Sequence, residues 1–239
     1  MQKPIIIEFT GFSGSGKTTI MNELIKNNFF DDNFCVFDIK TNSIDTNFLS
    51  KSKINKLVSI IFSLIKNPSL HLNFITLLIK SKAKFWKHYK MFVFMIYRYD
   101  NAKIKSKYLV FDEYYLKYFG QFSSKIDDNK LDEYIKNFLP SEKNIYPIHF
   151  EISDHKECIK RKSERNKKEF SAEELKKRVE KRKKIGPKYK YTIQKYCELT
   201  NKPYLEVDGD ASIEEKTKQV MKHIEYILEI TGNKKELGS

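Results

Sequence analysis

The chain has 239 residues, of which 40% are hydrophobic and 32% are charged, and its formal net charge is +14 at pH 7. This length supports one substantial core and is short for two independent domains, so we expect a single domain over residues 1–232 and a flexible tail at 233–239. The apolar run Ile5 to Ile7 is too short for a signal peptide. Cys35, Cys158 and Cys197 show no pairing or metal-ligand spacing. These features predict a cytoplasmic protein with free thiols.

The positive charge is concentrated in one stretch of the chain. Residues 154–190 hold 16 Lys or Arg against 7 Asp or Glu, so this stretch carries +9 of the net +14. A high charge is typical of nucleic-acid-binding proteins. An excess confined to one stretch suits a polyphosphate substrate as well as it suits a polynucleotide. Because the charge is local, we favour the polyphosphate and keep a nucleic-acid partner as the alternative.

A glycine-rich motif, GFSGSGKT at residues 11–18, follows the apolar run 4–9 and precedes a helix-compatible segment at 19–26. In such a strand–loop–helix unit the loop amides point inward, and the helix N-terminus adds partial positive charge. We expect Lys17 to bind the β- and γ-phosphates of a nucleoside triphosphate, and Thr18 to ligate magnesium. The residues predicted to bind the nucleotide here are Gly11, Ser13, Gly14, Ser15, Gly16, Lys17, Thr18 and Thr19.

A second buried strand is predicted at residues 34–38, with Asp38 at its carboxyl end. Ligands of open parallel sheets bind beyond the carboxyl ends of the strands, so Asp38 is placed to meet a substrate hydroxyl. A turn or helix cap explains the same residue equally well.

Residues 45–100 are predicted to form a helical region on the acceptor side, divided by Pro68. The segment 84–99 is aromatic and basic, and a helix on a membrane surface is one interpretation of it. Its apolar run at 91–97 is too short to span a bilayer, and a helix buried against the sheet is favoured.

A third strand is predicted where Tyr108-Leu-Val-Phe runs into Asp112 and Glu113. Two carboxylates at this sheet edge can hold magnesium and accept a proton from an attacking hydroxyl, which we favour over a simple helix cap. Tyr114 follows, in a segment predicted to be helical, where it either lines an acceptor pocket or packs in the core.

A fourth strand at 145–152 is followed by the basic stretch, in which Asp154 and the sequence Ser171-Ala-Glu-Glu174 are helix start signals. We expect a helical hairpin, a lid over residues 154–190. Arg161 and Arg165 are four residues apart on one helix face, where they can neutralise a transferring phosphoryl group or simply be solvated. A fifth strand at 203–207 leads to Asp208 and a helix at 212–230.

This order of elements resembles the P-loop nucleoside and nucleotide kinases, especially the thymidylate kinase and deoxynucleoside kinase group. The resemblance implies a three-layer α/β fold with a five-stranded parallel sheet of order 2-3-1-4-5, flanked by helices and carrying a helical lid. It also implies that Arg161 and Arg165 are lid arginines, that Arg98 binds phosphate or substrate, and that the loop from Asp208 to Ala211 contacts adenine.

Two departures from thymidylate kinases bear on the acceptor. Those enzymes carry an acid within the phosphate loop, where this chain has Phe12 and Ser13, and an Asp-Arg pair where it has Asp112 and Glu113. The loss of that arginine argues against thymidylate. The loop FTGFSGSGKTT also resembles that of adenylylsulfate kinases, and thymidylate-kinase-like proteins occur as accessory enzymes of surface-polysaccharide pathways. The predicted acceptor is a nucleoside, a nucleotide or a phosphorylated sugar derivative.

The sequence therefore predicts a kinase that uses ATP and Mg²⁺ to phosphorylate a small molecule. Glu113, or Asp38 instead, accepts the hydroxyl proton, while Arg161 and Arg165 stabilise the transition state. The alternative is a polynucleotide end kinase or a nucleotide-dependent nucleic-acid-binding protein, whose binding would weaken steeply with salt. A GTPase-type switch is a less favoured third interpretation, and a homodimer is compatible with the sequence.

Overall fold

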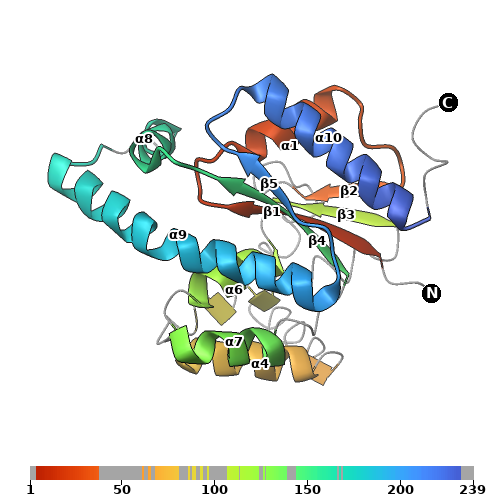
Figure 1. Ribbon diagram of the computed structural model, residues 1–239, viewed down its shortest axis with the longest axis horizontal. Coiled ribbons are helices and arrows are strands. Elements are labelled where there is room, and N and C mark those ends of the chain that lie inside the picture. The colour runs from red at the N-terminus through yellow and green to blue at the C-terminus, as the bar shows by residue number, and fades with distance from the viewer. Residues whose placement is uncertain are drawn as a thin grey trace.

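Five parallel strands form one sheet in the order β2-β3-β1-β4-β5 (Figure 1). The strands are β1 (Ile5–Gly11), β2 (Phe34–Phe37), β3 (Tyr108–Phe111), β4 (Ile145–Glu151) and β5 (Leu205–Asp208). The computed structural model describes residues 4–37, 68–80, 107–112, 114–123, 126, 128–138, 144–165, 167 and 169–232, with 61, 64, 65, 86, 88, 89, 92, 93 and 96. The predicted strand order is confirmed.

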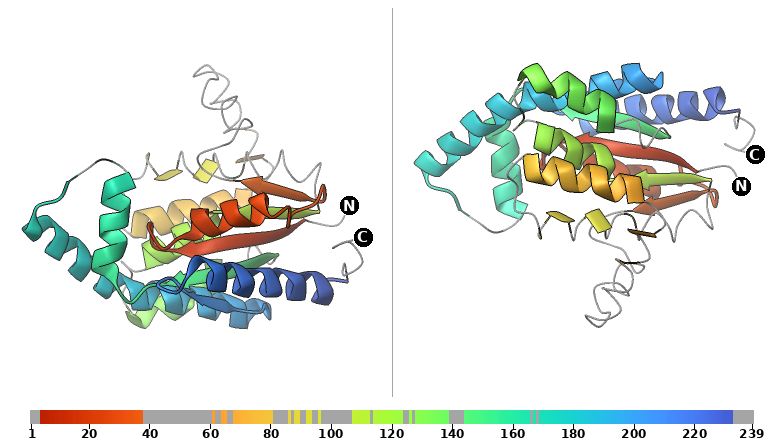
Figure 2. Two further views of the ribbon diagram at one scale, coloured as in Figure 1. Left: turned by 90° about the horizontal axis from the view of Figure 1, so that it is seen from above. Right: turned by 90° about the horizontal axis from the view of Figure 1, so that it is seen from below.

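Helices cover both faces of the sheet (Figures 1 and 2). On one face lie α1 (Lys17–Lys26) and α10 (Ile213–Ile230). On the other face lie α6 (Tyr115–Ser123) and α9 (Ala172–Thr200), with α4 (Pro68–Lys80) and α7 (Asp128–Phe138) outside them. The remaining labelled helix, α8 (His155–Arg165), and the first half of α9 project beyond the carboxyl ends of the strands.

The alternating side chains of the strands build two cores. Ile6 and Leu109 pack with α6 and α9 on one face, whereas Ile7, Phe9 and Val110 pack with α1 and α10 on the other. Successive strand residues point to opposite faces, so strands buried on both sides must be apolar almost throughout. This explains why the short apolar runs of the sequence located these strands.

The predicted helix start signals are present. Ser171 forms a capping box with Glu174, and the Asp154 carboxylate accepts a hydrogen bond from Glu157 N at 2.8 Å. Ser212 forms a second capping box, with Glu215, which was not predicted. Each satisfies backbone N–H groups that a helix leaves without partners in its first turn.

Of the segment 84–99, the structure describes six helical residues. Tyr89, Phe92, Val93 and Ile96 are buried in the core on the α6 and α9 side, and the Phe92 ring stacks on Phe74 of α4 with centroids 3.9 Å apart. These contacts agree with the buried helix that the sequence favoured. Among the described residues, none of the helices combines the length and the apolar character needed to cross a membrane.

Helices α6 and α9 come close enough to require a glycine. A Cβ added to Gly120 of α6 would overlap the ring of Tyr189 on α9. The Tyr189 hydroxyl in turn accepts a hydrogen bond from Gly11 N at 3.1 Å, at the point where β1 ends. One aromatic side chain thus joins α6, α9 and the start of the glycine-rich loop.

Candidate active site

The glycine-rich loop connects β1 to α1 and rests directly on α8. Gly14 and Gly16 have φ values of 100° and 93°, a region that residues with a Cβ rarely adopt. A Cβ at Gly14 would also overlap the carbonyl oxygen of Cys158. The two glycines therefore permit both the loop conformation and its close approach to α8.

Lys17 is the buried cation at the centre of this loop. Its side chain is held by the loop itself, because Nζ donates to Gly11 O at 3.1 Å and to Phe12 O at 2.9 Å, with a longer contact to Ser15 Oγ at 3.4 Å. Burial lowers the pKa of Lys17, and the nearby Asp112 carboxylate opposes this shift. The loop thus presents a positive charge inside a ring of its own backbone groups.

Thr18 and Asp112 meet next to this lysine. The Thr18 hydroxyl donates to Asp112 Oδ2 at 2.5 Å, and Asp112 is only 4% exposed. Its other oxygen, Oδ1, is buried and has no hydrogen-bond partner within the described part of the chain. A hydroxyl and a carboxylate oxygen are ligands that Mg²⁺ accepts, so these residues fit a magnesium ion.

No group of three or more His, Cys, Asp or Glu side chains in the described ranges could hold a metal by itself. Magnesium commonly binds through one or two protein oxygens together with substrate phosphates and water. The pair of Thr18 and Asp112 therefore matches a metal that arrives with a polyphosphate.

A pocket of about 430 Å³ opens between the loop, α8 and the start of α10. Of the predicted residues, those that line it are Ser13, Gly14, Gly16, Lys17, Thr18, Thr19, Asp112, Arg161 and Arg165. Gly11, Ser15 and Asp208 are not part of this lining. Two lysines that sequence reasoning missed, Lys162 and Lys216, also line it.

The charge of this lining is strongly unbalanced. Its acidic side chain is Asp112, and its basic side chains are Lys17, Arg161, Lys162, Arg165 and Lys216. Fixed positive charges around a low-dielectric cavity favour an anionic ligand. The pocket is therefore electrostatically suited to a polyphosphate.

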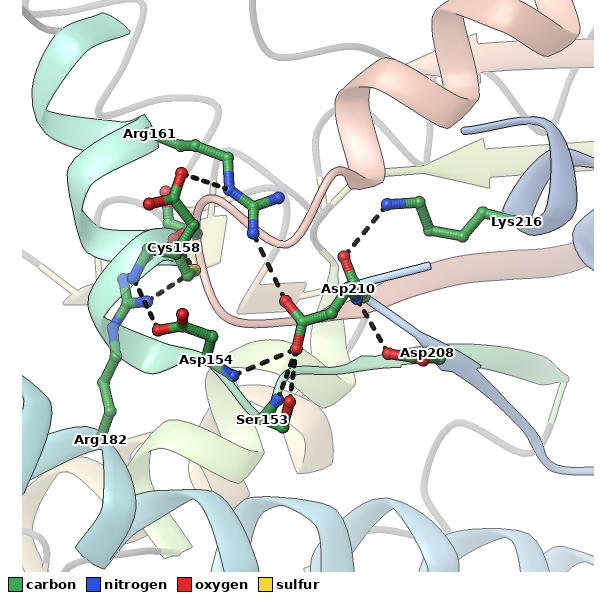
Figure 3. Close-up of polar contacts among 11 residues, drawn as sticks. Ser153, Asp154, Cys158, Arg161, Arg182, Asp208, Asp210 and Lys216 are labelled. Atoms are coloured by element: carbon green, nitrogen blue, oxygen red, sulfur yellow. Dashed lines mark hydrogen bonds and ion pairs between the residues drawn. The ribbon is translucent and has the colours of Figure 1, made fainter. Parts of the chain in front are cut away.

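Arg161 is held over the pocket by Asp210 (Figure 3). Its Nη2 lies 3.4 Å from Asp210 Oδ1, while Asp210 Oδ2 accepts from Ser153 N and Oγ, each at 2.8 Å, and from Asp154 N at 3.1 Å. Although burial opposes it, these hydrogen bonds lower the pKa of Asp210. The loop after β5 thus fixes the N-terminus of α8 and one of its arginines.

Arg182 of α9 is a further contact that the sequence did not indicate. Its Nη1 donates to Cys158 Sγ at 2.8 Å (Figure 3). Its Nη2 donates to Ser13 O at 2.9 Å, and its guanidinium lies over the Phe12 ring at 5.2 Å. Phe12 therefore faces α9, and its ring also lies against that of His155 in α8, with centroids 5.7 Å apart. In the run of basic residues from 181 to 184, spacing alone gives no sign that Arg182 turns inward.

Glu8 of β1 is buried in the sheet and accepts hydrogen bonds from the amides at the start of α6. The donors are Tyr114 N at 3.0 Å, Leu116 N at 2.9 Å and Lys117 N at 2.8 Å. Burial raises the pKa of Glu8 to about 7, against the effect of these bonds, and burial together with the charge of Lys17 lowers the pKa of Lys117 to about 7. A glutamate inside the apolar run Ile5 to Phe9 was the available signal for this arrangement.

Four of the predicted substrate-side residues have different outcomes. Tyr114 is 3% exposed, and its ring stacks on Phe111 at 4.6 Å, so it lies in the core on the α6 side. Asp38, Arg98 and Glu113 lie outside the described residues, as do most of the region 45–100 and the tail 233–239.

Residues 129–132 read Asn-Lys-Leu-Asp, a tetrapeptide that matches the guanine signature of GTPases in spacing. They lie within α7, where Asp132 accepts a hydrogen bond from Tyr191 of α9, and they are not among the pocket-lining residues. The tetrapeptide therefore gives no support to a GTPase.

Together, the parallel sheet of order 2-3-1-4-5, the glycine-rich loop after the central strand and the helices on both faces define the P-loop kinase fold. Among solved structures, the chain is similar to deoxyadenosine kinase from M. mycoides with bound dATP. The TM-score is 0.50 with 16% identity over 92% of this chain and 98% of that chain. The resemblance predicted from the sequence is confirmed at the level of the fold.

Two further structures of that enzyme also match. The one with products dCMP and a flexible dCDP has a TM-score of 0.45 and 15% identity over 93% of this chain and 100% of that one. The one with bound dCTP has a TM-score of 0.43 and 16% identity with the same coverage of both chains. No family model and no curated protein matches the sequence.

Proposed function

We propose that this protein is a kinase that transfers the γ-phosphoryl group of ATP, with Mg²⁺, to a hydroxyl of a nucleoside, a nucleotide or a phosphorylated sugar derivative. The observation that carries the proposal is the junction of Lys17, Thr18 and Asp112 at one end of a pocket lined with basic side chains. Phosphoryl transfer depends mainly on positioning and on neutralising charge, and this pocket offers both. The deoxyadenosine kinase fold supports the same proposal.

In this proposal the pocket residues have three separate roles. Lys17 and the loop amides bind the donor, Thr18 and Asp112 hold the metal, and Arg161 and Arg165 neutralise charge on the transferring group. Magnesium, when bound, neutralises phosphate oxygens and aligns them. Glu113, or Asp38 instead, is proposed to accept the proton of the acceptor hydroxyl.

Replacing Lys17 tests this assignment. We expect Lys17→Ala to lower ATP-dependent transfer by at least about 100-fold, since it removes a charge from the site of charge development, while leaving a cooperative thermal transition. The matched control is Lys26→Ala, an exposed lysine on the same helix, which should keep the wild-type rate. Near-normal transfer by Lys17→Ala would contradict the proposal.

The acceptor is found by measuring ADP release with nucleosides, nucleoside monophosphates, sugar derivatives and 5′-hydroxyl oligonucleotides. We expect at least one small acceptor to raise the basal rate. Stimulation by oligonucleotides alone, with steeply salt-dependent binding, would instead support the polynucleotide end kinase.

A further inference from the structure

Lys216 lies in the first turns of α10 and points back toward the loop that follows β5 (Figure 3). Its side chain is almost completely buried, with 4% exposed, although α10 carries its other described lysines on the surface. The Nζ atom donates one hydrogen bond, to Gly209 O at 3.0 Å. Lys216 is therefore a buried cation at the edge of the pocket rather than a solvated one.

The charge of Lys216 is not balanced by an ion pair within the described residues. Asp210 and Asp208 are close enough for their charges to act on Lys216. Asp210, however, is already bound to Ser153, Asp154 and Arg161. An ammonium group has three N–H donors, and Gly209 O accepts only one of these bonds. Burying a cation with such incomplete compensation is costly unless another acceptor arrives.

The place where this acceptor would bind is defined by the glycine-rich loop. A Cβ added to Gly16 would lie 3.4 Å from Lys216 Nζ, so the ammonium group lies beside the residue that immediately precedes α1. Backbone amides in this part of a phosphate loop cradle the α- and β-phosphates of a nucleotide. Lys216 and Lys17 line the same pocket from α10 and α1 respectively.

The chemistry of the group favours a phosphate over a base edge. An ammonium is a compact point charge that offers only donors, which suits phosphate oxygens. The other basic side chains of the pocket point to the same class of ligand.

We infer that Lys216 is a second phosphate-binding lysine, which contacts the α- or β-phosphate of the donor and stabilises the diphosphate that leaves. This inference rests on the proposed function.

In the transfer, the bond between the γ-phosphorus and the β,γ-bridging oxygen breaks, and its electron pair remains on that oxygen of the diphosphate. The acceptor oxygen forms the new bond to phosphorus, and its proton passes to a carboxylate. Lys216 acts on the negative charge that the diphosphate gains.

Direct binding measurements test the inference without relying on turnover. The probes are inorganic tripolyphosphate, ADP and GDP, titrated calorimetrically against wild-type protein, Lys216→Met and Lys216→Gln. Lys216→Gln can still donate to Gly209 O, so it guards against loss of the fold. Lys218→Met, an exposed lysine on the same helix, is the matched control.

We expect both Lys216 variants to weaken tripolyphosphate, ADP and GDP by a similar factor, about 10- to 100-fold, as for the loss of a charge-assisted bond. Lys218→Met should bind all three as the wild type does. Tripolyphosphate affinity within about twofold of wild type in either folded Lys216 variant overturns the inference. So does a changed preference between ADP and GDP with unchanged tripolyphosphate binding, which would make Lys216 a base contact.

The same proteins separate this inference from the proposed function. If the Lys216 variants lose tripolyphosphate binding while the wild type phosphorylates no acceptor, the phosphate contact stands and the kinase proposal fails. If the wild type transfers phosphate and the Lys216 variants bind normally, the kinase proposal stands and the role of Lys216 fails.

Discussion

At the scale of single residues, the proposed metal site is made by two distant parts of the chain, the Thr18 hydroxyl and the Asp112 carboxylate. Thr18 lies in the first turn of α1, and Asp112 follows β3. Strands β1 and β3 are neighbours in register from Ile5 and Tyr108 onward. Parallel pairing brings their carboxyl ends to one edge of the sheet. The 2.5 Å contact between the two side chains is therefore a consequence of the strand order.

Asp112→Asn is expected to raise the Mg²⁺ concentration needed for half-maximal transfer by at least about tenfold, because an amide is a weaker ligand for a hard cation than a carboxylate. Affinity for ATP in the presence of EDTA should change little. The measurement is a magnesium titration of the transfer rate, with the exposed Asp32→Asn as control. An unchanged magnesium dependence would remove Asp112 from the proposed metal site.

At the scale of elements, the start of α6 is anchored by a side chain of a strand. The Glu8 carboxylate of β1 accepts hydrogen bonds from three backbone amides that lie in, or just before, the first turn of α6. These amides carry partial positive charge and lack partners within the helix, so a carboxylate there is favourable. Complete burial opposes ionisation, and Lys117 lies close enough for the two charges to interact. The start of α6 thus rests on a buried acid.

This anchor predicts a pH-dependent stability. Burial raises the pKa of Glu8 from 4.5 to about 7, so the folded state binds this proton more tightly than the unfolded state. Its contribution is fully present below pH 4.5 and is lost as pH rises through about 7, on the order of 3 kcal/mol in all. The free energy of unfolding of the wild type, minus that of Glu8→Gln, should therefore fall between pH 4.5 and 7.

Urea unfolding at several pH values measures this difference. Lys117→Met provides an opposite comparison, because a lysine whose folded pKa is depressed to about 7 adds stability only as pH rises above that value. A flat difference between the wild type and Glu8→Gln over the lower range would show that Glu8 stays ionised.

At the scale of the whole molecule, the sequence predicted the strands and the loop because each is a local signal. Buried parallel strands read as apolar runs, and the phosphate loop has fixed spacing, so residues 11–18 and 108–112 could be assigned directly. The strand order came from the resemblance to a known family. The predicted ends of the elements were less accurate. The fifth strand was expected at 203–207 and begins at Leu205, and α9 continues to Thr200, beyond the stretch 154–190 expected for the lid.

The contacts that the sequence did not predict are those made across long separations. Lys216 meets the loop at Gly16, Arg182 meets Ser13, and Glu8 meets the amides of α6 only after the helices have packed on the sheet. Arg182 and Lys216 lie in segments that hold several other basic residues. Glu8 lies in an apolar strand that matches no functional motif. Their positions depend on helix rotation, which propensity and spacing do not determine.

The packing of Gly120 against Tyr189 makes the proposed nucleotide binding vulnerable from outside the pocket. In a random-mutagenesis screen for loss of ATP binding, Gly120→Ala is expected to be recovered. The added methyl group displaces the Tyr189 ring and thereby its hydrogen bond to Gly11 N. Overpacking of this kind costs about 1 to 3 kcal/mol of stability.

Urea unfolding and ATP titration of Gly120→Ala measure both effects, and Tyr189→Phe isolates the hydrogen bond. Unchanged ATP affinity in Gly120→Ala would mean that the loop keeps its shape without this support, and that a search for inactivating substitutions need not extend to the α6–α9 contact.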